Sequence, residues 1–442
     1  MDQHTRQALF TAFDPQQPLR RDTAGLYVPR AGSVTEELME ELSFSGPRRF
    51  LLAGAVGSGK STELYRFLQQ MEGDARRVTL LVDLFAQFDV RALTAGQVVF
   101  LVATAILGSS GASGAQSRAL EERLARVYRG LVEDEQHAEI DLAALLSGLA
   151  TAVAGIALSV PAAAAATAAG ALASAAAPRL SLPGSGRPLP PNAPQARELI
   201  DLLRDVVQLA RERSGKRLLV LVDGLDKVRD EEQIRDLFCS GVLSCREVNS
   251  LDLVFSAPPS LRFQVGFSGG EGFQMLRLGL FGIIHRDGSM EPSAYDSMWE
   301  VLRRRIISAN LDPAKVLPGG DRRDSTVDVA IEQSGGLVRD FMHIFRRAVV
   351  KTGDEAGSSL RPEDIDAGIQ RRRLEYLDLL DLGRENLLIE TLKTKQRPGG
   401  DEVDHLLNDN LILIYDNGAP WCRPHPMVLS RLEQRSTEER RP

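Results

Sequence analysis

The residues best suited to chemistry form a glycine-rich run that follows a short apolar segment. The run reads Gly54-Ala55-Val56-Gly57-Ser58-Gly59-Lys60-Ser61, and Thr62 comes next. Its fixed positions match the pattern of a loop that joins a strand to a helix and cradles phosphate. Glycines let backbone N–H groups converge on a phosphate, Lys60 adds a positive charge, and the Ser61 hydroxyl can hold Mg²⁺. The run therefore predicts a nucleotide-phosphate site.

The segments around this run supply the elements that must position it. Apolar residues 50–53 predict a buried strand, and residues 61–70 predict a helix whose positive end points at the anion. Further short apolar runs predict strands at 78–84, 218–223 and 253–256. Helical patterns occur at 33–43, 94–107, 116–134 and 196–213. Strands that alternate with helices indicate an α/β fold with a parallel sheet.

Two carboxylates at the end of a predicted strand could complete the site. Asp223 ends the apolar strand 218–223, where a carboxylate can hold the Mg²⁺ of a nucleotide bound to the loop. Asp226 is the candidate that orients or activates water, and its alternative role is a helix N-cap. No Glu follows Asp223 directly, so we expect slow hydrolysis of ATP, which suits a switch better than a motor.

These motifs resemble those of the AAA+/STAND branch of the P-loop NTPases. The resemblance depends on residues 54–64 and on Asp223-Gly224-Leu225-Asp226, and it covers most of the chain except an apolar insert and the first 20 residues. It implies a P-loop NTPase core over residues 33–290, a helical lid over 291–375 and a winged-helix domain over 376–442. Residues 1–32 are expected to form an extended lead-in.

The resemblance implies two contacts with the terminal phosphate. Ser256 ends the strand at 253–256, at the position of sensor 1, and its alternative is a hydroxyl bonded to the backbone. Arg339, within Ser334-Gly335-Gly336-Leu337-Val338-Arg339-Asp340, lies in a segment similar to the sensor-2 region of the lid. Its alternative is a solvated helix residue paired with an acid such as Asp340.

Two more residues are assigned nucleotide contacts by the same resemblance. Arg30 follows Tyr27, Val28 and Pro29, where the family places an adenine-binding box. His425 lies between two prolines, where STAND switches carry a histidine that contacts the β-phosphate of ADP. A neutral imidazole can donate one hydrogen bond to such a phosphate.

The C-terminal part tests a rival function, an ATPase that loads onto DNA. Residues 401–408 predict a helix, and residues 411–415 and 421–422 predict a hairpin. This helix and its end carry Asp401, Glu402, Asp404 and Asp409, which would repel DNA phosphates. Residues 371–373, three arginines, are interpreted as a solvated helix face. DNA therefore remains a disfavoured partner.

An uncharged segment of 37 residues, 142–178, raises a second alternative. Residues 142–160 are long enough for one membrane crossing, and KAP-like P-loop NTPases place membrane spans in the same part of the chain. A soluble helical insert over 139–195, used for assembly or for docking a partner, is the favoured interpretation, because small residues suit helix–helix contacts. A mostly disordered insert is the third.

Composition and charge fit a cytoplasmic protein. Lys plus Arg number 53 and Asp plus Glu number 60, which gives a net charge of −7 and no overall field that attracts nucleic acid. Three cysteines are too few for a disulfide framework, and no signal-peptide pattern opens the sequence. We therefore expect an ATP/ADP-operated switch that controls self-association or a separate effector. Its place in phage defence follows by analogy.

Overall fold

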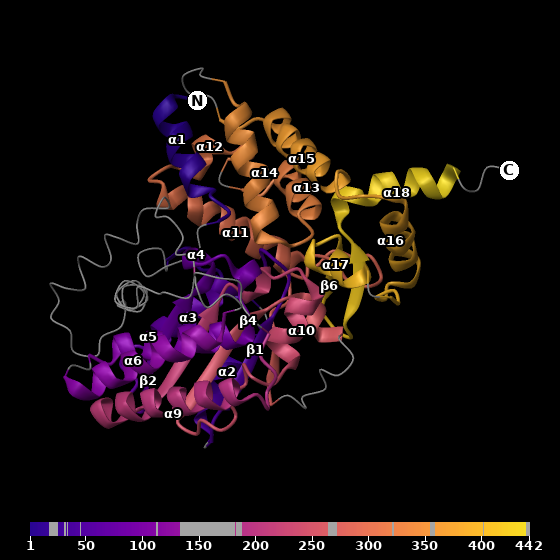
Figure 1. Cartoon of the computed structure of the whole chain (residues 1–442). Coiled ribbons are helices and arrows are strands. Elements are labelled where there is room, and N and C mark those ends of the chain that lie inside the picture. The colour runs from indigo at the N-terminus through magenta and orange to yellow at the C-terminus, as the bar shows by residue number, and fades with distance from the viewer. Residues whose placement is uncertain are drawn as a thin grey trace. The chain divides into compact units, whose positions relative to one another are not determined.

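The protein divides into two compact units (Figure 1). The computed structural model describes residues 1–16, 25–30, 32, 34–44, 46–111, 114–132, 182, 188–263, 272–320, 322–353, 359–400 and 402–438. The sheet unit comprises Val34–Ala53 and Leu64–Arg277, and the helical unit comprises Met1–Ser33, Gly54–Glu63 and Leu278–Pro442. The uncharged segment 142–178 lies outside the described residues, and so do all three interpretations of it.

The sheet unit is built on five parallel strands, as the alternating pattern predicted. Their bounds are β1 Arg49–Ala53, β2 Arg77–Asp83, β3 Arg217–Asp223, β4 Leu251–Ala257 and β5 Gln274–Arg277. The strand order is β2-β3-β4-β1-β5, and every neighbouring pair is parallel. The central strands are apolar throughout because both faces of the sheet are covered. The predicted α/β fold class is confirmed.

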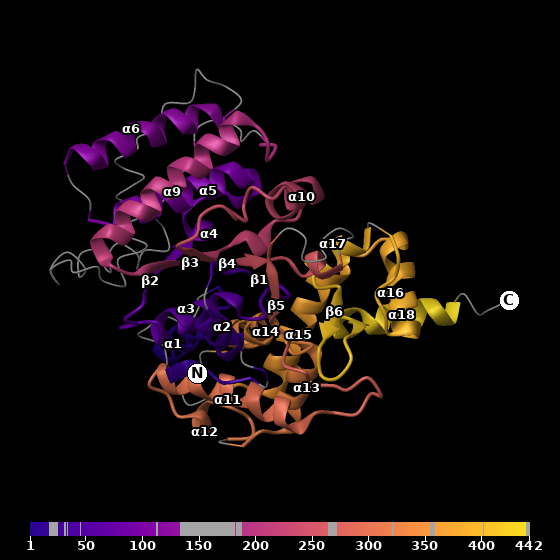
Figure 2. The same cartoon turned by 90° about the horizontal axis from the view of Figure 1, so that it is seen from below.

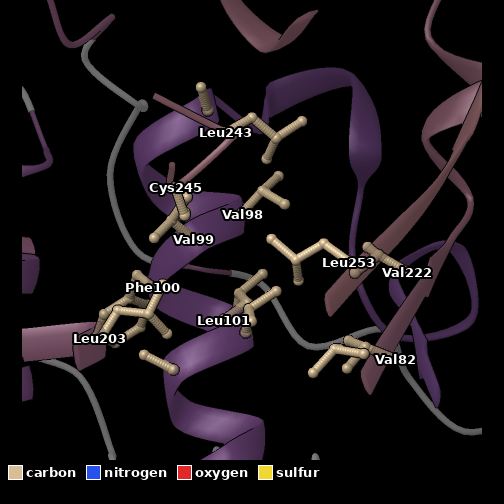
Figure 3. Packing of buried hydrophobic residues seen from close by; sticks show 14 of the residues in the cluster. Val82, Val98, Val99, Phe100, Leu101, Leu203, Val222, Leu243, Cys245 and Leu253 are labelled. Carbon is tan, nitrogen blue, oxygen red and sulfur yellow. The ribbon is translucent and has the colours of Figure 1, made fainter. Parts of the chain in front are cut away.

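Three long helices, α5 Ala95–Ser109, α6 Ala115–Gly130 and α9 Pro194–Ser214, pack together on one side of this sheet (Figure 2). The sheet unit also contains α2 Val34–Ser43, α4 Leu84–Gln87 and α10 Glu231–Cys239. Every residue of α5 from Ala95 to Leu107 is buried, because α9 covers one side of it and the strands cover another. Figure 3 shows Val98 and Leu101 of α5 pointing toward Val222 and Leu253 of the strands.

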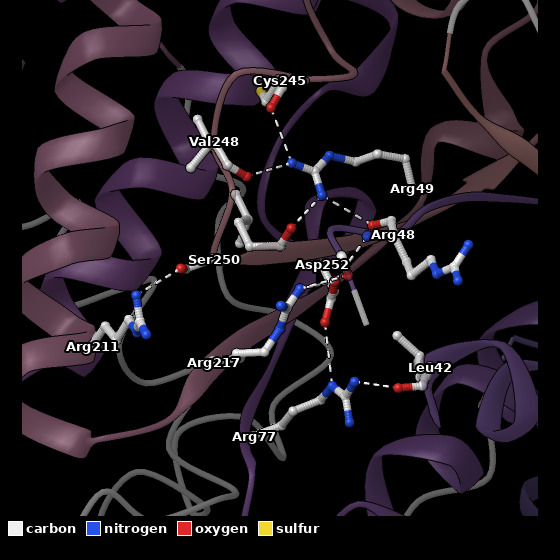
Figure 4. Close-up of polar contacts among 12 residues, drawn as sticks. Leu42, Arg48, Arg49, Arg77, Arg211, Arg217, Cys245, Val248, Ser250 and Asp252 are labelled. Carbon is white, nitrogen blue, oxygen red and sulfur yellow. Dashed lines mark hydrogen bonds and ion pairs between the residues drawn. The ribbon is translucent and has the colours of Figure 1, made fainter. Parts of the chain in front are cut away.

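A buried charge cluster fixes the sheet at the amino ends of its strands (Figure 4). Asp252 of β4 is fully buried and pairs with Arg77 Nε at 3.2 Å and with Arg217 Nη2 at 3.0 Å. It also accepts a hydrogen bond from the backbone N–H of Arg48, at 2.9 Å. Four strands therefore share one carboxylate, since Arg77 begins β2, Arg217 begins β3 and Arg48 precedes β1.

The helical unit contains nine helices and a hairpin among its described residues. The helices are α1 Gln3–Ala12, α11 Pro292–Ser308, α12 Pro313–Val316, α13 Ser325–Gln333, α14 Val338–Lys351, α15 Pro362–Leu377, α16 Leu382–Thr394, α17 Glu402–Asn408 and α18 Pro426–Glu438. The hairpin pairs β6 Ile412–Tyr415 with β7 Trp421–Pro424. The predicted helix and hairpin are confirmed. The winged-helix identity and the boundaries at 290 and 375 stay predictions.

The prediction of an extended lead-in is wrong at its start. Residues Gln3–Ala12 form α1, which packs against α14 and α11. The Asp2 side chain caps the helix by accepting from the Thr5 N–H at 2.9 Å. Leu9 and Phe13 are fully buried, and the Phe13 ring centre lies 5.9 Å from that of Phe345. The helix forms because these apolar side chains have a tertiary surface to cover, which the local sequence does not reveal.

Candidate phosphate-binding loop and its surroundings

The glycine-rich run follows β1, and its last two residues, Lys60 and Ser61, begin α3 Lys60–Gln70, the strand–loop–helix context that was predicted. Gly57 has φ +86° and Gly59 has φ +103°, in the left-handed region that favours glycine. A Cβ on Gly57 would lie 2.4 Å from Arg339 Cβ, so a larger residue there would also collide with α14. Both glycines are therefore required by the backbone and not merely tolerated.

The Lys60 side chain lies against the loop on which a phosphate would bind. Its Nζ donates to the carbonyl oxygens of Gly54 at 2.7 Å and Ala55 at 2.9 Å, and its side chain is buried. The loop also closes on itself through the Ser58 N–H, which donates to Ala55 O at 3.1 Å. Ser58 Oγ is fully buried and has no hydrogen-bond partner among the described residues. A buried cation and an unsatisfied hydroxyl beside the start of a helix are groups that an anionic oxygen would satisfy.

Ser61 and Thr62 occupy the first turn of α3 and are partly exposed. The Ser61 hydroxyl is a hard oxygen donor, the type that Mg²⁺ prefers. The described residues contain no group of three or more His, Cys, Asp or Glu residues that could hold a metal by themselves.

Both arginines that the sequence assigned to the nucleotide lie against the loop in the helical unit. The guanidinium of Arg30 donates to the Ser58 carbonyl and, at 3.0 Å, to the Gly279 carbonyl. Its carbon Cζ lies 4.5 Å from the centre of the Phe281 ring. Burial lowers the pKa of Arg30, and the nearby Glu63 opposes that effect. The Arg339 backbone N–H donates to the Gly57 carbonyl at 3.3 Å.

A third contact with the loop was not predicted. The Asn410 side chain donates through Nδ2 to the Val56 carbonyl at 2.8 Å. Asn410 follows α17 and is separated from Val56 by 354 positions. No local motif marks it, and the one signal in the sequence is an Asn at a predicted helix end, which is common for unrelated reasons.

His425 is buried within the helical unit. Its Nδ1 accepts the Met427 N–H at 3.2 Å, so the proton of the neutral ring is on Nε2, which lies 3.1 Å from Asp340 Oδ2. The ring stacks on Tyr376 with centres 4.1 Å apart. Burial lowers the pKa of His425, although Asp340 opposes this, and the imidazole is therefore neutral. His425 therefore contacts Asp340, the residue that follows Arg339.

Asp340 has other partners than the predicted Arg339. It accepts hydrogen bonds from Arg372 Nη2 at 2.6 Å and from the Tyr376 hydroxyl at 2.6 Å. Arg372 also bonds Glu375, and 19% of its side chain is exposed. The interpretation of residues 371–373 as a solvated face is therefore wrong for Arg372, because the buried charge of Asp340 requires a cation.

In the sheet unit, Asp223 and Ser256 both accept from the Gly224 N–H, and Asp226 lies beside Ser256. The Gly224 N–H donates to Ser256 Oγ and to Asp223 Oδ1, both at 2.8 Å. Ser256 Oγ lies 3.5 Å from Asp226 Oδ1. Asp226 lies inside the short 3-10 helix Leu225–Lys227, whose N-cap is Gly224, so the alternative role of Asp226 as an N-cap is wrong. The alternative for Ser256, a hydroxyl bonded to backbone, is confirmed.

Sheet topology places this group at a definite edge. β1, β4 and β3 are neighbours and parallel, with Ala53 opposite Ala257 and Val222 opposite Phe255. Their carboxyl ends therefore lie at the same edge of the sheet, the edge from which the chain leaves β1 for Gly54. Ligand sites of parallel α/β sheets form at this edge.

No family model and no curated protein matches the chain. Solved structures with some likeness include a Walker-type ATPase of Pyrococcus abyssi, with a TM-score of 0.44, 13% identity and coverage of 96% of this chain and 99% of that chain. The ORC2 protein of Aeropyrum pernix, in its ADP form, has a TM-score of 0.43, 12% identity and coverage of 97% and 96%. Cdc6p of Pyrobaculum aerophilum has a TM-score of 0.35, 12% identity and coverage of 98% of each chain.

No helix in the described part of the chain is long and apolar enough to span a membrane.

Proposed function

We propose that this chain binds ATP and ADP on residues 54–61 and hydrolyses ATP slowly, as a nucleotide-operated switch. The observation that carries the proposal is the loop itself, with two left-handed glycines and the buried ammonium of Lys60 between a parallel strand and the start of α3. The phosphates would be held by the backbone N–H groups of the loop and of the first turn of α3, which includes Thr62, and by the Lys60 ammonium.

The residues present fit magnesium as well as the nucleotide. Ser61 would supply a hydroxyl ligand and Asp223 a carboxylate, both of the oxygen type that Mg²⁺ prefers. Bound magnesium would neutralise charge on the phosphate oxygens. Asp223 is 3% exposed and lies at the carboxyl end of β3.

Asp226 and Ser256 are the groups that would orient water for hydrolysis. The Ser256 hydroxyl accepts from Gly224 N–H, so its own proton is free to point toward Asp226. Asp226 is 6% exposed, and a carboxylate there can accept a proton from water. Because no Glu follows Asp223, one carboxylate serves this step, and turnover is slow.

The switch itself would be read at the start of α14. Arg339 contacts the loop through its backbone, and the next residue, Asp340, holds His425 and Tyr376. A change in the loop would therefore reach the hairpin segment, residues 410–425, through the first turn of α14. In this proposal His425 acts through Asp340, which refines the direct contact with ADP that the resemblance implies. The output would be self-assembly or control of a separate effector, as in bacterial defence switches.

The test is a Lys60→Ala substitution with a fluorescent ATP analogue and magnesium. The phosphate charge then loses its point-charge partner, so the dissociation constant should rise at least about a hundredfold. Lys393→Ala, an exposed lysine in α16, is the matched control and should bind as the unsubstituted chain does. Equal affinity in both variants would contradict the assignment of the loop.

A further inference from the structure

Three separate parts of the chain hold three consecutive carbonyls of the loop. Asn410 Nδ2 bonds the Val56 carbonyl, the Arg339 N–H bonds that of Gly57, and the Arg30 guanidinium bonds that of Ser58. One donor precedes the sheet unit in sequence, one begins α14 and one follows α17. We propose that Asn410 is a positioning residue for bound nucleotide, through which the C-terminal hairpin segment sets the affinity of the loop. This inference rests on the proposed function.

The physical basis is the planarity of the peptide bond. In a trans peptide, the carbonyl of one residue and the N–H of the next point in opposite directions, and the plane cannot twist cheaply. A donor fixed on the Val56 carbonyl therefore sets the direction of the Gly57 N–H. The donor from Arg30 on the Ser58 carbonyl likewise sets that of the Gly59 N–H. Amides aimed in advance bind an anion without the cost of ordering the loop.

Asn410 is itself held in place by the C-terminal elements. Asn410 is 7% exposed and has φ +60°, a conformation that Asn adopts more readily than most residues. Its N–H donates to Leu407 O of α17 at 3.2 Å. The next residue, Leu411, accepts the His425 N–H at 2.9 Å. Any displacement of this segment would withdraw the donor from Val56.

The consequence is reciprocal coupling. If the docked hairpin segment tightens nucleotide binding by some factor, nucleotide must favour the docked segment by the same factor. Asn410 thus gives the loop a second link to the C-terminal end, separate from the link through Arg339 and Asp340.

The experiment compares two substitutions with a matched control. Asn410→Asp keeps the shape but sets a carboxylate against the Val56 carbonyl, and Asn410→Ala removes the whole amide group, the donor included. Asn310 has φ +59° and is exposed, so Asn310→Asp and Asn310→Ala control for the left-handed backbone. ADP and ATP affinities are measured by calorimetry beside urea unfolding curves.

Both Asn410 variants should weaken ADP binding about tenfold or more, with Asn410→Asp the weaker binder, while the Asn310 variants bind normally. Folded Asn410 variants that bind ADP like the unsubstituted chain would overturn the inference. If neither Asn410 variant folds, hydrogen exchange on the unsubstituted chain decides. ADP should slow exchange in residues 406–415, and unchanged exchange there would overturn the inference. Failure of the unsubstituted chain to bind nucleotide would instead refute the proposed function.

Discussion

Among single residues, Arg49 shows how the strand before the loop is anchored. Its guanidinium is buried and donates to the main-chain carbonyls of Ser244 at 2.6 Å, Cys245 at 3.0 Å and Val248 at 2.9 Å. Burial lowers the pKa of Arg49. One side chain therefore ties residues 244–248 to β1 (Figure 4).

The Arg49→Met substitution should lower the free energy of unfolding by about 3 kcal/mol, because buried carbonyls lose their donors. Urea unfolding followed by circular dichroism measures this. Arg48→Met is the control, since the Arg48 side chain is 31% exposed and its pair with Glu41 is worth at most about 1 kcal/mol. Equal losses in the two variants would show that the Arg49 carbonyl contacts contribute no special stability.

The sequence could not distinguish these two neighbours. Both are arginines at the start of an apolar run, and the acceptors of Arg49 are main-chain carbonyls about 200 residues away, with separations of 195 and 199 for Ser244 and Val248. The loop could be predicted, because phosphate chemistry requires its residues to be adjacent. Asn410 could not, because its partner is fixed only by the fold.

Among the elements, α14 carries Asp340 and His343, two of the groups that respond to acid, and the third, His425, lies directly before α18. Burial lowers the pKa of His343 from its usual 6.5 to about 4, and it also lowers the pKa of His425. Both are neutral in the folded chain and take up a proton more readily when unfolded. Their contribution to stability is therefore complete above pH 6.5 and falls as the pH is lowered from there, for His343 down to about pH 4.

The contribution of Asp340 to stability is lost at a lower pH than that of the histidines. Burial alone would raise the pKa of Asp340, but Arg372, His425 and Tyr376 together hold it well below its usual value. Its stabilisation is thus present above about pH 4 and is lost only in stronger acid. A fall in stability between pH 6.5 and 4.5 would come from the histidines and not from Asp340.

We expect the melting temperature of the unsubstituted chain to fall as the pH is lowered from 6.5 to 4.5. The His343→Gln variant should show a shallower fall, because one of the two imidazoles with a lowered pKa is gone. Differential scanning calorimetry across that range measures both slopes. A His343→Gln chain with the same slope as the unsubstituted chain would contradict the assignment.

Most strands of the sheet unit could be predicted from periodicity alone, and two other elements, β5 in the sheet unit and α1 in the helical unit, show why some could not. β5 has only Met275 and Leu276 between polar residues, too short an apolar pattern to mark a strand, and it exists because β1 offers it hydrogen bonds. Helix α1 depends on apolar side chains that cover α11 and α14. In both, tertiary partners decide the structure.

For the whole molecule, the loop is one of the places where the chain passes from one unit to the other. Residues Gly54–Glu63 belong to the helical unit, whereas β1 before them and most of α3 after them belong to the sheet unit. The donors on the loop carbonyls come from the helical unit, and Asp223, Asp226 and Ser256 belong to the sheet unit.

Isothermal titration calorimetry of the purified chain with ATP and magnesium tests this account most directly. We predict saturable binding with about one nucleotide per chain, and binding of ADP at the same site shown by competition. The absence of heat for both nucleotides, in a chain shown to be folded, would contradict the central claim that residues 54–61 hold a nucleotide.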